Sequence, residues 1–177
     1  PHLLGRRQRQ MCIRDRRHIP ARPTTDYAKE GLFNILQNNV EFDELKCLDL
    51  FAGTGNISYE LASRGSTDLT CVELDTPSVK FIQSVAEKLD MNIQVLQMDV
   101  FEFIRKTKSK FNFIFSGPPY KLDILDSLPN EVFEHELLEK DGWLVLEHNP
   151  LHSFDDHPNF RHKRNYGTTI FSIFINN

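Results

Sequence analysis

The most constraining feature of the sequence is a regular alternation between short apolar runs and longer amphipathic segments. Strands are expected at 46–51, 69–74, 93–98, 111–115, 143–147 and 168–175. Helices are expected from Thr24 or Thr25 to about Asn38, and over 57–64, 79–89, 100–106 and 122–138, the last with a break at Pro129. Such alternation predicts a parallel, doubly wound sheet with helices on both faces. The two closing strands lack an intervening helix, which predicts an antiparallel hairpin at one edge.

Length and composition limit the class of protein. The 177 residues fit one domain, which we place at 17–177. No apolar run approaches the roughly 20 residues that a bilayer span needs, and no signal-peptide pattern opens the chain. The three cysteines show no metal-ligand spacing, and Cys47 and Cys71 lie in apolar runs typical of buried thiols. We therefore expect a cytoplasmic monomer without a metal or a membrane anchor.

The net charge of −4 is unevenly distributed along the chain. Residues 1–22 carry seven arginines and one aspartate, so the remainder is strongly acidic. A basic arm is compatible with nucleic-acid binding, because phosphate neutralisation is local. A solvated tail explains residues 1–16 equally well. Two later basic groups, Arg105–Lys110 and Arg161–Arg164, are further candidates for contact with RNA phosphates, or else solvated helix ends and loops.

A glycine-rich loop follows the first strand. It reads Asp49-Leu-Phe-Ala-Gly-Thr-Gly55, and its glycines allow the backbone to approach a ligand. Glu73 ends the second strand, where an acidic side chain can accept from both hydroxyls of a ribose. NAD and S-adenosylmethionine both fit this pattern. Ser58 replaces the third glycine of a dinucleotide fingerprint, and Asp49 suits an ammonium and a sulfonium better than a phosphate. We favour S-adenosylmethionine, with Asp99 as an acceptor for the adenine amine or as a helix N-cap.

A second motif, Phe113-Ile-Phe-Ser-Gly-Pro-Pro-Tyr120, ends the fourth strand. Consecutive prolines stop the strand, because they donate no backbone hydrogen bond and hold φ near about −65°. The turn suits a flat base, whose amine donates to a backbone carbonyl while Tyr120 stacks on the ring. A stiff exit from the strand is the simpler interpretation. The glycine loop and the acidic Glu73 in the same chain favour the base-binding one.

Several motifs together resemble the RsmD family of bacterial methyltransferases, which modify a guanine N2 in 16S ribosomal RNA. They are Arg22-Pro-Thr-Thr-Asp26, Asp49–Asn56, Val72-Glu73, Met98-Asp99, the Pro-Pro-Tyr turn, Glu147-His148 and Tyr166-Gly167. The resemblance covers about residues 17–175. It implies a Rossmann-like class I methyltransferase fold of seven strands, S-adenosylmethionine as cofactor, and 16S rRNA as partner, alone or within the small ribosomal subunit.

The resemblance also implies the site residues. The cofactor would be bound by Arg22, Thr24, Thr25, Asp26, Asp49, Phe51, Ala52, Gly53, Thr54, Gly55, Asn56, Glu73, Asp99, Val100 and Ser116. Catalysis would fall to Gly117, Pro118, Pro119 and Tyr120. The Pro118 carbonyl would orient the target amine.

Two parts of the chain depart from the family pattern. Residues 1–16 do not match the usual opening strand, and we hypothesise that they are foreign sequence. The turn carries Gly117 where the family has aspartate or asparagine, whose side chain accepts from the target amine. Gly117 cannot do this, so we predict normal cofactor binding with weak methylation, which Gly117→Asp should restore. The alternatives are an amino-group methyltransferase acting on DNA or protein, or a cofactor- and RNA-binding protein without catalysis.

Overall fold

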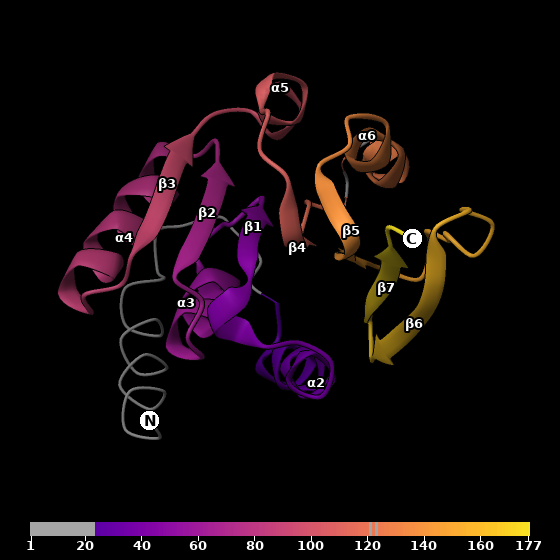
Figure 1. Ribbon diagram of the computed structural model, residues 1–177, viewed down its shortest axis with the longest axis horizontal. Coiled ribbons are helices and arrows are strands. Elements are labelled where there is room, and N and C mark those ends of the chain that lie inside the picture. The colour runs from indigo at the N-terminus through magenta and orange to yellow at the C-terminus, as the bar shows by residue number, and fades with distance from the viewer. Residues whose placement is uncertain (1–23, 121, 123) are drawn as a thin grey trace.

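The computed structural model describes residues 24–120, 122 and 124–177, so the expectations for Arg22 and residues 1–16 lie outside it. Seven strands form one sheet in the order β3-β2-β1-β4-β5-β7-β6 (Figure 1). Their bounds are β1 Lys46–Leu50, β2 Asp68–Glu73, β3 Ile93–Gln97, β4 Phe111–Ser116, β5 Leu138–His148, β6 Phe160–Tyr166 and β7 Thr169–Ile175. Strands β1 to β5 pair in parallel, and β7 pairs antiparallel with both β5 and β6. The predicted mostly parallel sheet with an antiparallel edge hairpin is confirmed.

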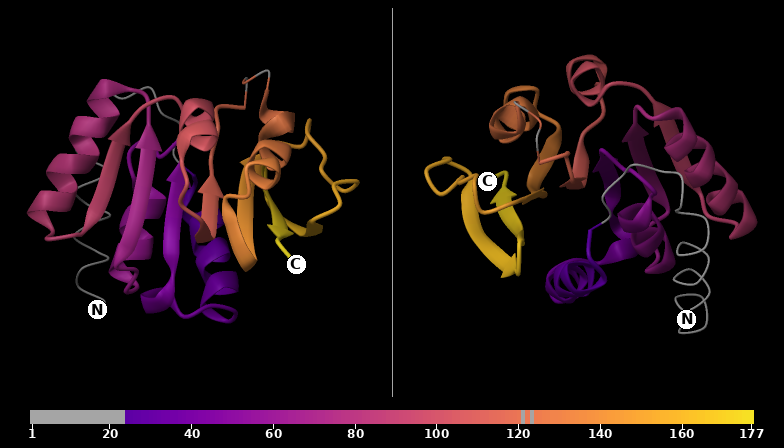
Figure 2. Two further views of the ribbon diagram at one scale, coloured as in Figure 1. Left: turned by 45° about the horizontal axis from the view of Figure 1, so that its top comes forward. Right: turned by 180° about the vertical axis from the view of Figure 1, so that it is seen from behind.

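Helices cover both faces of the sheet, as Figures 1 and 2 show. The α-helices are α2 Asp26–Gln37, α3 Asn56–Ser63, α4 Thr76–Lys88, α5 Val100–Lys106 and α6 Leu128–Glu134, with short 3-10 turns at Phe42–Glu44 and Leu125–Ser127. Successive strand residues point to opposite faces. Leu48 and Leu50 therefore pack with α5 and α6, whereas Cys47, Phe113 and Val145 pack with α2 and α3. The result is a three-layer α/β domain with a core on each side of the sheet.

Local capping explains where several helices begin. The Thr25 side chain accepts from the backbone N–H of Ala28 at 3.2 Å and caps α2. Asp75 caps α4, which also has a proline in its first turn, and Asp99 caps α5. A side-chain oxygen at this position satisfies a backbone donor that the helix itself leaves unpaired. These capping residues stand at the carboxyl-terminal side of the sheet or close to it, so they fix where the connecting loops leave the strands.

The segment 122–138 differs from the expected long helix. The chain forms the 3-10 turn Leu125–Ser127, then the short helix α6, and enters β5 at Leu138. Pro129 does not break a helix but lies in the first turn of α6, where its missing N–H has no helical partner to lose. Strand β5 is correspondingly longer than the expected 143–147, with an irregular register between Phe111 and Phe113 of β4.

Strand β6 was not expected from the residues, although the resemblance implied seven strands. Its sequence Phe-Arg-His-Lys-Arg-Asn-Tyr is mostly polar, because β6 is an edge strand with half of its length facing solvent. Such a strand carries little apolar pattern. Tyr166 and Thr169 pair across the turn at Gly167, whose φ of 67° suits glycine.

Within the described part of the chain, no helix is both long enough and apolar enough to cross a membrane. The same residues contain no group of three or more histidine, cysteine or acidic side chains arranged to hold a metal ion. Cys47 and Cys71 are buried thiols, as expected. Burial raises the pKa of the Cys47 thiol to about 12, so it stays protonated and apolar in the core.

Candidate active site

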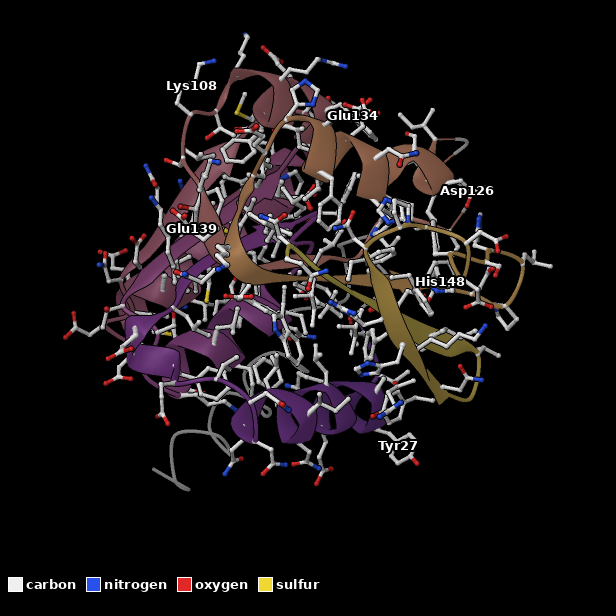
Figure 3. All side chains as sticks on the ribbon, turned by 45° about the vertical axis from the view of Figure 1, so that its right-hand side comes forward. Tyr27, Lys108, Asp126, Glu134, Glu139 and His148 are labelled. Carbon is white, nitrogen blue, oxygen red and sulfur yellow. The ribbon has the colours of Figure 1, made fainter. Side chains whose placement is uncertain are left out.

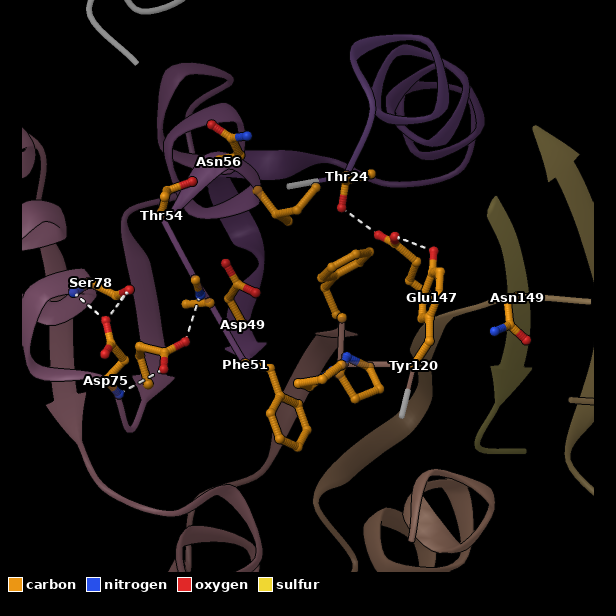
Figure 4. A pocket seen from close by; sticks show the side chains of 18 of the residues that line it. Thr24, Asp49, Phe51, Thr54, Asn56, Asp75, Ser78, Tyr120, Glu147 and Asn149 are labelled. Carbon is orange, nitrogen blue, oxygen red and sulfur yellow. Dashed lines mark hydrogen bonds between the residues drawn. The ribbon is translucent and has the colours of Figure 1, made fainter. Parts of the chain in front are cut away.

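A cavity of about 850 Å³ opens at the carboxyl ends of β1 and β4. The strand order reverses between these two neighbours, since β2 and β3 lie on one side of β1 and β4 to β7 on the other. Ligands of open α/β sheets bind at such a switch point. The walls come from the loop after β1, the end of β2, the turn after β4 and the loop after β5 (Figure 4).

The glycine loop takes backbone conformations that favour glycine. Gly53 and Gly55 have φ values of 54° and 78°, and Phe51 shares this left-handed region at 60°. A Cβ added to Gly55 would lie 2.8 Å from the ring of Tyr59, so this position has no room for a side chain. Gly55 is also the N-cap residue of α3. At Gly53, which lines the cavity, the loop therefore presents bare backbone, which allows a ligand to approach closely.

Glu73 holds the glycine loop against the end of β2. Its Oε2 accepts from the Gly53 backbone N–H at 2.7 Å, and its Oε1 accepts from the N–H groups of Leu74 and Asp75 at 2.8 Å each. A carboxylate has about four acceptor positions, so these contacts leave Glu73 able to accept from a ligand hydroxyl too. Glu73 therefore shapes the cavity in addition to its predicted contact with a ribose.

Asp49 lies at the centre of the cavity wall and is buried. Its Oδ2 accepts from the Ser58 hydroxyl at 2.6 Å and from the Ser58 N–H at 3.2 Å. Burial raises the pKa of Asp49 to about 7, and the nearby Glu73 carboxylate adds to the rise, whereas the Ser58 hydrogen bonds oppose it. A cationic ligand would favour the ionised form.

The Pro-Pro-Tyr turn forms the opposite wall. Gly117 is still tied to the sheet, since its N–H donates to the Leu50 carbonyl at 3.2 Å. The Tyr120 hydroxyl donates to Glu147 Oε1 at 2.8 Å, and the Thr24 hydroxyl donates to Glu147 Oε2. Figure 4 shows these three side chains together, across the cavity from Asp75 and Thr54. The segment before α2, the turn after β4 and the end of β5 therefore meet at the Glu147 carboxylate.

Most of the predicted site residues line this cavity. They are Thr24, Asp49, Phe51, Ala52, Gly53, Thr54, Asn56, Glu73, Gly117, Pro118, Pro119 and Tyr120. The other described ones do not line it: Thr25, Asp26, Gly55, Asp99, Val100 and Ser116. Thr25 and Asp99 have helix-capping roles, and the Ser116 hydroxyl is buried with no hydrogen-bond partner among the described residues.

Sequence reasoning missed several lining residues. They are Ile57, Asp75, Ser78, Phe115, Asn149 and Leu151, whereas Glu147 was named in the Glu147-His148 motif but not among the site residues. Asp75 could have been found, because it follows the carboxyl end of a parallel strand two residues after Glu73. Asn149 and Leu151 gave no signal of their own. They reach the cavity only because β5 pairs with β4, with Ser116 opposite Leu146.

The cavity is acidic. Four of its lining residues are carboxylic acids, Asp49, Glu73, Asp75 and Glu147, and among the described lining residues there is no lysine, arginine or histidine. Among these described residues a diphosphate would meet no compensating charge, whereas an ammonium or a sulfonium would be attracted. The donors and acceptors present therefore fit S-adenosylmethionine and do not fit NAD.

Solved structures of similar fold agree with this architecture. A hypothetical protein of Thermus thermophilus superposes with a TM-score of 0.78 at 27% identity, covering 88% of each chain. The Thermus thermophilus 16S rRNA N2 G1207 methyltransferase, solved with AdoMet and guanosine, superposes with a TM-score of 0.73 at 23% identity, over 90% of this chain and 45% of that one. The fold and the position of the cavity define a Rossmann-like class I methyltransferase domain.

Sequence comparison identifies the family. The model of the family described as Conserved hypothetical protein 95 matches residues 6–175. Ribosomal RNA small subunit methyltransferase D of Buchnera aphidicola is 29% identical over 140 residues, which are 78% of this chain and 71% of that protein. The chain belongs to this family, the RsmD family of ribosomal RNA methyltransferases.

Proposed function

We propose that this chain transfers a methyl group from S-adenosylmethionine to the exocyclic N2 of a guanine in 16S ribosomal RNA. The observation that carries the proposal is the meeting of two motifs, some sixty residues apart in sequence, in a single cavity: the glycine loop after β1 and the Pro-Pro-Tyr turn after β4. Family membership supports ribosomal RNA as the substrate. The guanosine bound to the structurally similar Thermus methyltransferase supports the base.

The cofactor would be held between the acidic side chains and the glycine loop. Glu73 is positioned to accept from ribose hydroxyls, and Asp49 to attract the amino-acid ammonium. The cofactor supplies an activated methyl group, so the protein needs no strong base. Its task is to hold the acceptor nitrogen in line with the methyl carbon. On this proposal the Pro118 carbonyl accepts from the target amine while Tyr120 stacks on the extruded base.

One observation favours a second candidate, a protein that binds cofactor and RNA but methylates weakly. Gly117 has no side chain to accept from the amine at the position where the family carries an acid or an amide. The loss of one preorganised polar group costs roughly 2–4 kcal/mol of transition-state stabilisation in other enzymes. Cofactor binding would survive, since Gly117 lies on the wall opposite to Glu73.

The test is incubation with methyl-labelled cofactor and either naked 16S rRNA or small ribosomal subunits, followed by nucleoside analysis. The proposal expects label in N2-methylguanosine. Label in an adenine, or in protein, would overturn the assignment of the substrate. Calorimetry with S-adenosylhomocysteine and NAD checks the cofactor separately, and tighter binding of NAD would overturn that part. Binding of S-adenosylhomocysteine and RNA without any label would favour the second candidate.

A further inference from the structure

A second carboxylate stands beside the position where the family acid is missing. Ser116, the last residue of β4, lies opposite Leu146 of β5, so Gly117 follows β4 where Glu147 continues β5. A Cβ built on Gly117 would lie 3.9 Å from Glu147 Oε2. The oxygens of an aspartate are two bonds beyond its Cβ. The Glu147 carboxylate therefore reaches nearly the same part of the cavity from the neighbouring strand.

Glu147 is buried, held in place and part of the cavity wall. Only 6% of it is exposed, and it lines the cavity with Gly117 and Tyr120. Its two oxygens are bound from different segments, Oε1 by Tyr120 and Oε2 by Thr24 (Figure 4). A functional group that is fixed by its neighbours before the substrate arrives meets the requirement for preorganisation.

We propose that the Glu147 carboxylate, rather than residue 117, accepts the hydrogen bond from the target amine and takes up its proton. This inference rests on the proposed methyl transfer to an exocyclic amine. Oε2, the oxygen nearest Gly117, is the acceptor, and the amine takes the place of the Thr24 hydroxyl there. Oε1 keeps the Tyr120 hydroxyl, so the group that orients the amine is linked to the ring that stacks on the base.

The chemistry of the step balances without another reactant. The amine nitrogen gives its lone pair to the methyl carbon, and the bond from that carbon to sulfur breaks with its electrons remaining on sulfur. The nitrogen then carries one proton too many. That proton passes along the existing hydrogen bond to Glu147 Oε2 and then to water. The hydrogen bond from the amine to this oxygen also holds the amine with its lone pair toward the methyl carbon.

The decisive experiment moves the acid from one strand to the other. Glu147→Gln keeps the size of the side chain and removes its charge. The double variant Gly117→Asp/Glu147→Gln returns a carboxylate from position 117, where its Cβ would lie 3.1 Å from the Phe115 ring and needs only a small shift of that ring. Glu134→Gln, an exposed position on α6, is the matched control. S-adenosylhomocysteine binding and thermal unfolding of each variant verify that it is folded.

Two measurements are compared. One is methyl transfer to 16S rRNA. The other is the ratio of the affinities for guanosine and for inosine, which lacks the 2-amino group. Both affinities are measured by nuclear magnetic resonance on protein saturated with S-adenosylhomocysteine. We expect wild type to prefer guanosine about tenfold or more, the scale of a hydrogen bond to a charged group. Glu147→Gln should abolish this preference and slow transfer roughly 100-fold. The double variant should recover most of both, and Glu134→Gln should match wild type.

The outcomes separate the inference from the proposed function. Wild type is expected to methylate guanine and to prefer guanosine. If Glu147→Gln keeps the same rate of methylation and the same preference, the inference is wrong and the proposed function stands. If Glu147→Gln loses both properties and the double variant fails to regain either while still binding S-adenosylhomocysteine, Glu147 acts only by positioning Thr24 and Tyr120, and the inference is again wrong. If wild type shows neither methylation nor preference, the proposed function fails, and the inference with it.

Discussion

At the scale of single residues, Asp49 shows how burial tunes a group for a cationic ligand. The carboxyl is held between the Ser58 hydroxyl and N–H, in a cavity that already contains Glu73. Desolvation and the neighbouring charge raise its pKa to about 7, so both the neutral and the ionised form of Asp49 are accessible near neutral pH. A bound ammonium would shift this balance toward the carboxylate, which links ligand binding to proton release.

The first prediction follows from that pKa. If the ionised form of Asp49 binds S-adenosylhomocysteine, only about one tenth of the protein is competent at pH 6, and the affinity should rise roughly tenfold between pH 6 and pH 8. Calorimetry in buffers of different ionisation enthalpy measures both the affinity and the released proton. Asp49→Asn should bind more weakly and show a flat profile over this range. An equally steep profile in the variant would contradict the assignment.

The raised pKa of Asp49 has the opposite pH dependence for folding: it stabilises the folded state at low pH rather than at high pH. Because the pKa of Asp49 is higher in the folded state than its ordinary 3.8, the protonated form favours folding. This contribution is fully present below pH 3.8 and is lost as the pH rises to about 7. We therefore expect Asp49→Asn to gain stability relative to wild type across that interval, with no further change above it. Urea unfolding of both proteins at several pH values measures the difference.

A further prediction concerns Glu73, which both holds the glycine loop and faces the ligand. Glu73→Ala removes a charged acceptor, so S-adenosylhomocysteine binding should weaken by about 1.5–3 kcal/mol, the scale of one such hydrogen bond. Loss of the brace on Gly53 should add to this and leave the loop N–H without its acceptor. Glu87→Ala, on the exposed side of α4, is the control. Calorimetric affinities that agree between the two variants would refute a role for Glu73.

Residue-scale prediction from sequence succeeded where the signal was local. Gly53 and Gly55 adopt left-handed backbone, and the Pro118–Tyr120 turn lines the cavity, because these residue types force their own conformations. Glu147 was named from the sequence as part of the Glu147-His148 motif, but not as a site residue. Its proximity to Gly117 depends on the pairing of β5 with β4, a long-range contact that no spacing in the sequence encodes.

At the scale of elements, α2 packs closely against the edge hairpin at Gly31. A Cβ on Gly31 would lie 2.2 Å from the ring of Tyr166, so a side chain at residue 31 would require this ring to move. Tyr27 adds an edge-to-face contact with the Tyr166 ring, at 5.4 Å between centroids, and Figure 3 shows it where α2 meets the hairpin. Since Thr24 lies two residues before the start of α2, this packing also helps to position the donor to Glu147.

We therefore predict that Gly31→Ala destabilises the protein by about 1–3 kcal/mol, the usual cost of overpacking. Alanine is the better helix former by about 1 kcal/mol, so a loss of stability would isolate the steric effect. Chemical denaturation of Gly31→Ala, Tyr166→Ala and the double variant gives the coupling between the two positions. The double variant should be more stable than the sum of the single losses predicts. Additive losses would mean that the two residues do not interfere.

Element boundaries were predictable where caps and apolar periodicity coincide, as in α2 and α5. They were not predictable over 122–138. There the apolar residues that suggested one helix are shared among a 3-10 turn, α6 and the start of β5. Edge strand β6 had no apolar alternation to detect, because its exposed positions are filled by Arg161, Lys163 and Arg164.

At the scale of the whole molecule, Lys108 and Arg164, one from each basic group, lie toward opposite ends of the sheet. Lys108 lies in the connection from α5 to the start of β4, whereas the cavity is at the end of β4, roughly 20 Å away at about 3.3 Å per residue. Figure 3 shows Lys108 well separated from His148, the neighbour of Glu147. Arg164, on the edge strand, pairs with Phe171, which pairs with Glu147, so it lies level with the cavity.

The last prediction uses this separation to locate the RNA. Each lost phosphate contact lowers both the affinity and the salt dependence of binding. We expect Arg164→Glu to weaken the binding of 16S rRNA several-fold and to reduce the slope of log affinity against log salt by about one. Lys108→Glu makes the same change of charge at the far end of the sheet and should do neither. Filter binding at several salt concentrations measures both quantities. Equal effects of the two substitutions would mean that RNA binding responds only to the net charge of the protein. A larger effect of Lys108→Glu would place the RNA at the end of the sheet away from the cavity, where it could not be methylated in this cavity.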